Sequence, residues 1–247
     1  MKDWLRFLPV IELLLVSFVV YSIARTVIRY RNSADGHDRL EGIRTALEPK
    51  LGKGLLLEIV MAEINVLHYS ILVWFRKSGE EERQGAFSYH KTSQIQIFVV
   101  VFSILILAEG LFVHFLLAQW NGAAAWIFTI LNLYALLYMI GLYNSVRFKP
   151  HLIKDDILMI YLGFQYYIKT EISNINSMKK AVDTGLSIPK DTCHAMLRID
   201  PPQVELALKE PVLMKASYGR SKYVKTIIFR ADEPGRMMEE IKSKMDC

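Results

Sequence analysis

Four long apolar stretches dominate the first 146 residues of the chain. They cover about residues 4–24, 54–75, 95–117 and 126–146. Each is close to the roughly 20 residues that an α-helix needs to cross about 30 Å of hydrocarbon. Aromatic residues flank the stretches where the two membrane interfaces would place them, namely Trp4, Trp74, Phe75, Trp120, Trp126 and Tyr143. The pattern predicts an α-helical membrane domain of four transmembrane helices over residues 1–146.

Two of these stretches have an alternative interpretation. Lys2 and Arg6 precede the first stretch and Ser22-Ile23-Ala24 ends it, which is also the pattern of a cleaved signal peptide. We expect a retained helix there. The second stretch is polar for a transmembrane span, so a buried helix of a soluble domain is its alternative. Its polar residues are Glu58, Glu63, Asn65 and His68.

The periodicity changes after Arg147. Short runs rich in β-branched and aromatic residues, separated by turn residues, predict strands at about residues 151–153, 157–163, 164–175, 195–199, 203–208, 212–216 and 222–231. The polar segment 177–190 is predicted to be a loop, and Pro211 is expected to bound a strand. Asp232-Glu233-Pro234 opens a closing helix. Residues 147–247 are therefore predicted to form a small α+β domain, and residues 149–244 should fold on their own.

Two blocks of this domain carry a family resemblance. The order turn, strand, glycine, strand in residues 147–175 and the closing segment TIIFRADEPGRMMEEI at 226–241 resemble bacterial pleckstrin-homology-like (PH-like) domains attached to membrane spans. The FSYHK segment at 87–91, Glu109, His114 and Ala125-Trp126 are similar to a group of bacterial multi-span membrane proteins. The resemblance implies a β-barrel or curled sheet with a C-terminal helix. It also implies a binding or scaffolding module rather than an enzyme, and it fixes no ligand.

Composition narrows the function classes. Apolar residues make up 52% of the 247 residues and charged residues 22%, which excludes a disordered chain. The two cysteines, Cys193 and Cys247, cannot form a disulfide framework. The chain has no phosphate-binding glycine loop, dinucleotide fingerprint or nucleophile elbow. The formal net charge of +5 comes without a nucleic-acid-reading motif. We therefore expect no cofactor and no nucleic-acid partner.

The basic residues near the span ends favour one membrane orientation only weakly. With four spans, both termini share a side with nine of them: Lys2, Arg6, Arg76, Lys77, Arg83, Lys91, Arg147, Lys149 and Lys154. The opposite side receives seven: Arg25, Arg29, Arg31, Arg39, Arg44, Lys50 and Lys53. The positive-inside rule then predicts cytoplasmic termini in a multi-pass protein of the inner membrane. The uncharged segment QWNGAAA at 119–125 agrees with an exported loop.

Ionisable residues inside membrane spans are costly and therefore candidates for function. The candidates within the predicted spans are the ionisable residues Glu12, Glu58, Glu63, His68, Glu109 and His114, together with Asn65 and Asn132. A helical rise of about 1.5 Å per residue places His68 and His114 about 20 Å apart in depth, too far for one metal ion. A smaller metal site around Glu63, Glu109 and His114 stays an alternative. We favour hydrogen bonds between helices: Glu12 with His68, Glu58 with His114, and Glu63 with Glu109 and Asn132.

Two further groups of residues are candidates for contact with lipid headgroups. Tyr89, His90 and Lys91 precede the third span. Lys215, Arg220, Lys222 and Lys225 surround one predicted hairpin, and basic residues near a membrane attract anionic lipid. Ordinary interface anchoring and a solvated hairpin are the alternatives. The sequence predicts a non-enzymatic accessory, regulatory or scaffolding protein that docks a protein partner or lipid at the bilayer. A membrane enzyme or permease that uses the intramembrane Glu and His groups is the alternative.

Overall fold

The computed structural model describes residues 25, 36–75, 85–182 and 189–245. The predicted span at 4–24 and its Glu12 lie outside these residues. The chain divides into two units, residues 1–61 and residues 62–247. The first unit contains helix α2 (Gly36–Leu51), which the sequence pattern did not predict, and the start of α3 (Leu55–Ser70). Within this unit Arg44 forms an ion pair with Glu58, and Lys53 Nζ lies 2.9 Å from Glu48 Oε1.

Among the residues that the structure describes, three helical segments are long and apolar enough to cross a membrane: Leu55–Trp74, Ile95–Ala118 and Gly122–Phe148. The first comprises α3 and the short 3-10 helix η2 (Leu72–Phe75), and the other two are α4 and α5. The predicted helices at 95–117 and 126–146 are confirmed. α5 begins four residues early because Asn121 caps it: its Oδ1 accepts hydrogen bonds from the N–H groups of Ala123 and Ala124, at 2.9 and 3.2 Å.

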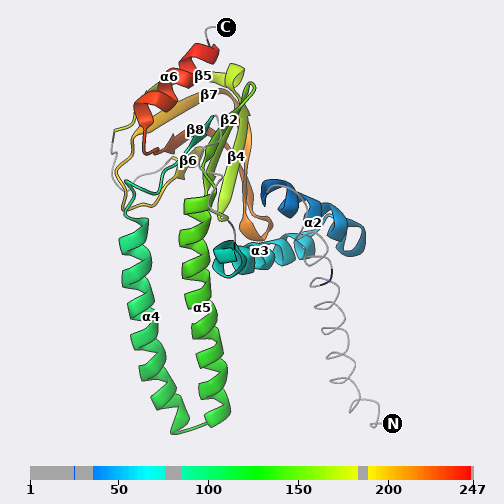
Figure 1. Cartoon of the computed structure of the whole chain (residues 1–247), viewed down its shortest axis with the longest axis vertical. Coiled ribbons are helices and arrows are strands. Elements are labelled where there is room, and N and C mark those ends of the chain that lie inside the picture. Colours follow the sequence, from blue (N-terminus) through cyan, green and yellow to red (C-terminus); the bar gives the residue numbers. More distant parts are fainter. Residues whose placement is uncertain (1–24, 26–35, 76–84, 183–188, 246–247) are drawn as a thin grey trace. The chain divides into compact units, whose positions relative to one another are not determined.

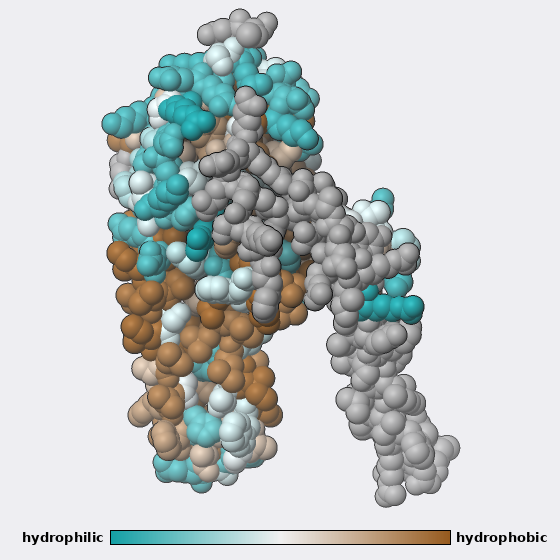
Figure 2. Space-filling model, viewed as in Figure 1, coloured by the Kyte–Doolittle hydropathy of each residue, from teal (hydrophilic) through white to brown (hydrophobic). Residues whose placement is uncertain are grey.

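The α4–α5 hairpin exposes most of its large apolar side chains. Figure 2 shows them as a brown band between the more polar sheet domain and the polar tip of the hairpin. They include Ile97, Val100, Ile104, Leu107, Leu111, Phe115, Trp126, Ile130 and Leu133. Gly110 lets α4 approach α5 closely, since a Cβ atom there would lie 2.8 Å from Asn132 Oδ1. Because an apolar surface of this extent is unfavourable in water, it indicates membrane association.

From Ala62 onward, α3 crosses α5 at a steep angle instead of lying alongside it (Figure 1). The crossing is close at Gly141, where a Cβ atom would lie 3.1 Å from the carbonyl oxygen of Val66. Asn144 Nδ2 donates a 2.9 Å hydrogen bond to the carbonyl oxygen of Tyr69. Glycine at the crossing and a polar side chain one turn later thus fix α3 against α5.

The rest of the second unit is one curled, mixed sheet closed by a C-terminal helix (Figure 1). Its strands are β1 (Ala86–Phe87), β2 (His151–Lys154), β3 (Ile157–Leu162), β4 (Tyr166–Glu171), β5 (Ile175–Lys180), β6 (Thr192–Ala195), β7 (Val204–Ala216) and β8 (Ser221–Phe229). The short 3-10 helices η3 (Ile172–Asn174) and η4 (Ser217–Gly219) precede β5 and β8. The strand order is β1-β2-β3-β4-β7-β8-β6, β5 pairs with β7, and β6 runs parallel to β8.

The closing helix α6 (Pro234–Met245) confirms the prediction from the Asp-Glu-Pro signal. Met237 and Ile241 lie on its buried face and join the sheet core. That core is built from alternate residues of the strands, as one buried sheet face requires. Its members include Leu158, Ile160, Ile168, Val204, Leu206, Val224, Ile227 and Phe229.

Three sheet predictions differ from the structure. Strand β5 extends to Lys180 and so covers the first four residues of the segment 177–190 that was predicted to be a loop. Its polar residues face outward, with Lys179 Nζ 3.1 Å from Glu205 Oε1. The strand predicted at 195–199 is instead β6, ending at Ala195. Pro211 does not end a strand, because β7 passes through it with a register shift between Ala207 and Val212. A bulge is where a strand tolerates proline.

The sheet also contains residues from ahead of α4. Strand β1 pairs with β2 through Ala86–Leu152 and Phe87–His151, and Phe87 belongs to the core. The sheet domain is therefore discontinuous in sequence, since the hairpin is inserted between β1 and β2. The predicted boundary at residue 147 marks only the second entry of the chain into this domain.

Candidate membrane-interface site

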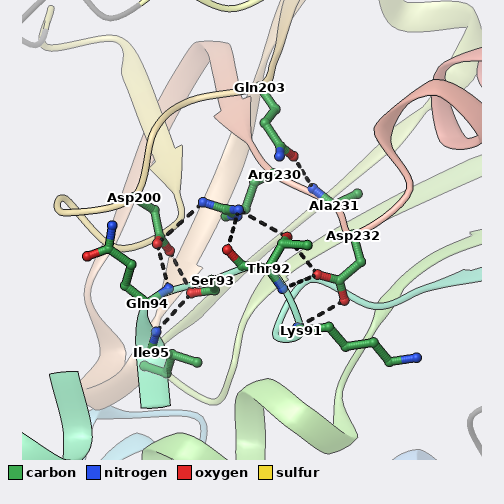
Figure 3. Close-up of polar contacts among 10 residues, drawn as sticks. All are labelled: Lys91, Thr92, Ser93, Gln94, Ile95, Asp200, Gln203, Arg230, Ala231 and Asp232. Carbon is green, nitrogen blue, oxygen red and sulfur yellow. Dashed lines mark hydrogen bonds and ion pairs between the residues drawn. The ribbon is translucent and has the colours of Figure 1, made fainter. Parts of the chain in front are cut away.

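A buried ion pair ties the start of α4 to the sheet domain (Figure 3). Arg230, directly after β8, places Nη1 3.3 Å from Asp200 Oδ1. The Asp200 carboxylate also accepts hydrogen bonds from Ser93 Oγ at 2.6 Å and from the N–H of Gln94 at 2.8 Å. Arg230 Nη2 donates to the carbonyl oxygen of Thr92 at 2.7 Å. A carboxylate is favourable beside a helix N-terminus because of the partial positive charge there.

Asp232 holds the same loop through separate bonds (Figure 3). It accepts from the N–H and the hydroxyl of Thr92, both at 2.8 Å, and from the N–H of Lys91 at 3.1 Å. Burial alone would raise the pKa of Asp232. The hydrogen bonds from Thr92, Ser88 and Lys91 stabilise the carboxylate and hold its pKa below the usual value. The loop is therefore fastened by two carboxylates that follow different strands.

His151 and Tyr89 form a buried stack beneath this loop. Their rings lie 4.3 Å apart and nearly parallel. His151 Nδ1 accepts from the N–H of Tyr161 at 3.1 Å, so Nε2 carries the proton and donates to the carbonyl oxygen of Arg230 at 2.9 Å. Burial lowers the pKa of His151 to about 4, although the Arg230 carbonyl and Asp232 act in the opposite direction. The ring is therefore neutral at physiological pH.

Tyr89 was a candidate for lipid contact, and the structure places it in the core. Its side chain is 1% exposed and its hydroxyl oxygen accepts from the N–H of Gly163 at 2.8 Å. Lys91 is exposed and His90 is half-buried. Of the three candidates ahead of the hairpin, only Lys91 presents its side chain freely to the surroundings.

Glu63 lies where α3, α5 and the β7–β8 turn meet. Its carboxylate accepts hydrogen bonds from the hydroxyls of Tyr134 in α5 and of Tyr218 in η4, the second at 3.2 Å. Tyr218 adopts a left-handed backbone conformation with φ of 61°, which is uncommon for a non-glycine residue. Burial raises the pKa of Tyr218, and the charge of Glu63 raises it further. The phenol thus remains a hydrogen-bond donor.

The other intramembrane candidates do not converge with Glu63. His114 Nδ1 donates to Thr129 Oγ1 at 2.7 Å, because that hydroxyl itself donates to the carbonyl oxygen of Ala125. Asn132 packs against Gly110, and Glu109 is exposed on α4. Glu58 pairs with Arg44 in the first unit, and His68 is buried. Within the second unit, the partners of Glu63 thus differ from those expected from depth alone, since α3 does not run parallel to the hairpin.

Among the described residues, no three His, Cys, Asp or Glu side chains come together in a group that could hold a metal ion. Glu63, Glu109 and His114, the candidate metal ligands, each have a different environment. The chemistry available at Glu63 is hydrogen bonding between a carboxylate and two phenols.

The basic candidates of the β7–β8 hairpin have different roles. Lys222 Nζ donates to the carbonyl oxygen of Thr192 at 2.8 Å and so bridges β8 to β6. Lys215, Arg220 and Lys225 are exposed. Lys215 lies opposite Tyr167 of β4, which itself lies opposite Tyr161 of β3. Directly paired residues share a sheet face, so Lys215 belongs to a row of aromatic side chains.

Lys149 also belongs to this row, although it was not among the residues predicted to bind lipid. It directly follows α5, and its Nζ lies 4.6 Å from the ring centre of Tyr161 and 5.9 Å from that of Tyr167. Burial lowers the pKa of Lys149 to about 8, so it is mostly charged at neutral pH. Lys149 has no carboxylate partner within the described ranges of the chain. Its position at the end of the fourth span was the only sequence signal that could have marked it.

Comparisons with models of protein families, with curated proteins and with solved structures found no match to this chain.

Proposed function

We propose that this protein is a non-enzymatic membrane-anchored docking protein whose sheet domain binds an anionic lipid headgroup. In this proposal, the α4–α5 hairpin spans the inner membrane and the sheet domain, a PH-like module, lies on its cytoplasmic face. The binding group, which we call the Lys–Tyr row, consists of Lys149, Tyr161, Tyr167 and Lys215. The single observation that carries the proposal is the charged Lys149, one residue beyond α5, above two tyrosine rings and without a carboxylate partner in the part of the chain described.

The position of the Lys–Tyr row supports lipid as the ligand. Lys149 directly follows the C-terminal end of a helix whose apolar surface suits hydrocarbon, and Lys and Tyr are typical of the headgroup region. Tyr167 is 37% exposed, Lys215 is exposed and Lys149 is half-buried. In this proposal a phosphate contacts Lys215 beside the Tyr167 ring and takes its second ionic contact from Lys149. Each basic residue near an anionic surface contributes about 1 kcal/mol.

The fastening of the sheet domain supports a docking role. The bonds from Asp200, Arg230 and Asp232 hold the loop before α4, and α5 runs almost directly into β2. Both ends of the hairpin are therefore joined to the same sheet by short connections. A module attached in this way keeps a constant height above the bilayer, which is useful for a scaffold or a lipid-dependent regulator. The enzyme or permease alternative gains no support from Glu63, Glu109 and His114, because they do not share a site.

The test uses the purified full-length protein in a mild detergent, titrated with short-chain phosphatidylglycerol or phosphatidylcholine. We expect phosphatidylglycerol alone to raise the thermal midpoint, and high salt to weaken this effect. The double variant Lys149→Gln/Lys215→Gln should bind phosphatidylglycerol about 30-fold more weakly, from about 1 kcal/mol for each lysine. Lys225→Gln is the matched control, since Lys225 is an exposed lysine of β8 four residues beyond Ser221, the partner of Lys215.

Two results would contradict the proposal. One is an equal shift of the midpoint with phosphatidylcholine, which would indicate that the apolar band alone binds the lipid. The other is an unchanged affinity of the double variant for phosphatidylglycerol, which would leave protein docking as the better account of the exposed sheet face.

A further inference from the structure

We infer that α3 lies along the membrane interface with one apolar face in contact with lipid, and that it does not cross the bilayer. This inference rests on one part of the proposed function, namely that the α4–α5 hairpin spans the membrane. It does not depend on the Lys–Tyr row.

The first argument is the distribution of side chains on α3. Leu67 of α3, Ile71 directly after it and Trp74 of η2 are 45%, 44% and 68% exposed, and their spacing of four and three residues puts them on one side of this helical segment. The polar residues His68 and Ser70 are buried. The helix also buries the apolar residues Ile64, Val66 and Tyr69. What distinguishes it from a helix in water is that its exposed side is apolar as well, and such a face fits contact with hydrocarbon.

Glu63 gives the direction of that exposed face. It lies one turn before Leu67 on the same side of the helix, and it bonds to Tyr134. Tyr134 is seven residues closer to the hairpin tip than Gly141, where α3 crosses α5, which is about 10 Å along α5. The exposed face of α3 is therefore turned toward the part of the hairpin that carries the apolar band. The two phenols that bond to Glu63 cover the one carboxylate on this side.

The second argument is the height of the crossing. Gly141 is 19 residues beyond Gly122, the first residue of α5, which corresponds to about 28 Å of helix. The hydrocarbon core of a bilayer is about 30 Å thick. With the hairpin tip at one interface, α3 therefore crosses α5 at the level of the other interface. A steeply crossing helix at this level lies in the plane of the membrane surface.

The basic residues of the sequence agree with this placement. With the span predicted from sequence at 4–24, an interfacial α3 would move the seven basic residues between Arg25 and Lys53 to the side of the sheet domain and leave only Lys2 and Arg6 on the other side. The distribution of basic residues between the two sides then changes from nine against seven to fourteen against two. The positive-inside rule is then clearly satisfied.

The deciding experiment places single cysteines at Lys50 and Trp120. Trp120, at the hairpin tip, is 82% exposed, and Lys50 is exposed near the end of α2. Four spans put both positions on the exported side, whereas an interfacial α3 puts them on opposite sides. Intact cells that carry Lys50→Cys or Trp120→Cys, each with Cys193→Ser and Cys247→Ser, are treated with an impermeant thiol reagent. We expect labelling at position 120 before lysis and at position 50 only after lysis. Labelling of both positions in intact cells would overturn the inference.

A second measurement determines the depth of α3 directly. Full-length protein, with its other tryptophans replaced by Phe, is reconstituted in phosphatidylcholine vesicles with lipids brominated near the headgroup or near the chain end. Trp74 and the tryptophan of a Leu67→Trp/Trp74→Phe variant should show the same shallow quenching. A spanning helix would separate them by about 10 Å in depth, and absence of quenching at both would mean that a second protein chain covers the face. Leu107→Trp, in the middle of α4, is the control for the hairpin and should be quenched deeply. Its failure would contradict the proposed membrane anchor itself.

Discussion

The Asp200–Arg230 ion pair should be the most sensitive point of the junction between hairpin and sheet. Both side chains are almost fully buried, with 1% and 4% exposed. Asp200→Asn preserves the shape but leaves the Arg230 charge without a counter-ion. Breaking a buried pair in this way costs about 3–5 kcal/mol. For a chain of this size, that corresponds to a fall in the thermal midpoint of roughly 6–20 °C.

Cys193 provides a specific assay for this prediction. It is buried in the sheet core, and burial raises the pKa of its thiol to about 11, so it should react with a thiol reagent only when the sheet opens. Labelling is followed against temperature in the full-length protein with Cys247→Ser. Glu205→Gln is the control: it removes the pair with Lys179, whose side chain is 66% exposed, and should cost less than about 1 kcal/mol.

A double variant separates the pair interaction from local damage. Arg230→Met combined with Asp200→Asn should be less destabilising than the sum of the single changes, because the unpaired buried charge is removed. If the free energy of sheet opening in Asp200→Asn lies within about 1 kcal/mol of the wild-type value, as expected for an exposed pair, the ion pair does not hold the junction and the reasoning is refuted.

Three further outcomes are expected. Because the pKa of His151 is lowered in the folded protein, the unfolded chain takes up a proton at this residue as pH falls from about 6.5 to about 4, while the native state does not. Up to about 3 kcal/mol of stability, fully present above pH 6.5, is lost across this window. The thermal unfolding of His151→Phe should lack this component of the pH dependence. Gly163→Ala should destabilise the protein by at least about 1–3 kcal/mol, since the φ of Gly163 is +48° and a Cβ atom there would lie 2.2 Å from Ser145 Oγ. The control is Gly235→Ala, where nothing lies within 4 Å of the added Cβ atom. Equal thermal midpoints of the two variants would contradict this prediction. The sequence alone predicted that residues 149–244 fold on their own, but β1 and Phe87 belong to the same sheet and core. We therefore expect this fragment to be poorly folded by circular dichroism and to gain structure when a peptide of residues 85–94 is added; a stable fragment without the peptide would show that these residues are dispensable.

The sequence predicted correctly those helices and strands that are determined by the residues they themselves contain. The helices at 95–117 and 126–146 follow from long apolar runs, and α6 follows from its acidic start and proline. The first strands after the hairpin follow from β-branched runs between turn residues. These signals needed no knowledge of tertiary partners.

The predictions failed where tertiary packing decides. The polar residues of β5 pair with β7 although their sequence is typical of a loop. Pro211 sits inside β7 because the strand changes partners there, from β5 to β4. The predicted span at 54–75 corresponds to a segment that is long and apolar enough to cross a membrane, and the interfacial placement that we infer for it rests on the crossing at Gly141, which no local pattern reveals. Asp200 and Arg230 are 30 residues apart in sequence, so no spacing rule could have paired them.

The insertion of the hairpin between β1 and β2 has a consequence for biogenesis. In the proposed arrangement, with the hairpin across the membrane, the sheet can close only when the segment before α4 and the segment after α5 are on the same side, since Tyr89 must reach His151 and Thr92 must reach Arg230. A hairpin that is only half inserted would separate these segments by the thickness of the bilayer. Folding of the sheet domain therefore reports correct insertion: a wrongly threaded chain keeps an open, apolar core that quality-control proteases can recognise, while a correctly threaded one hides it.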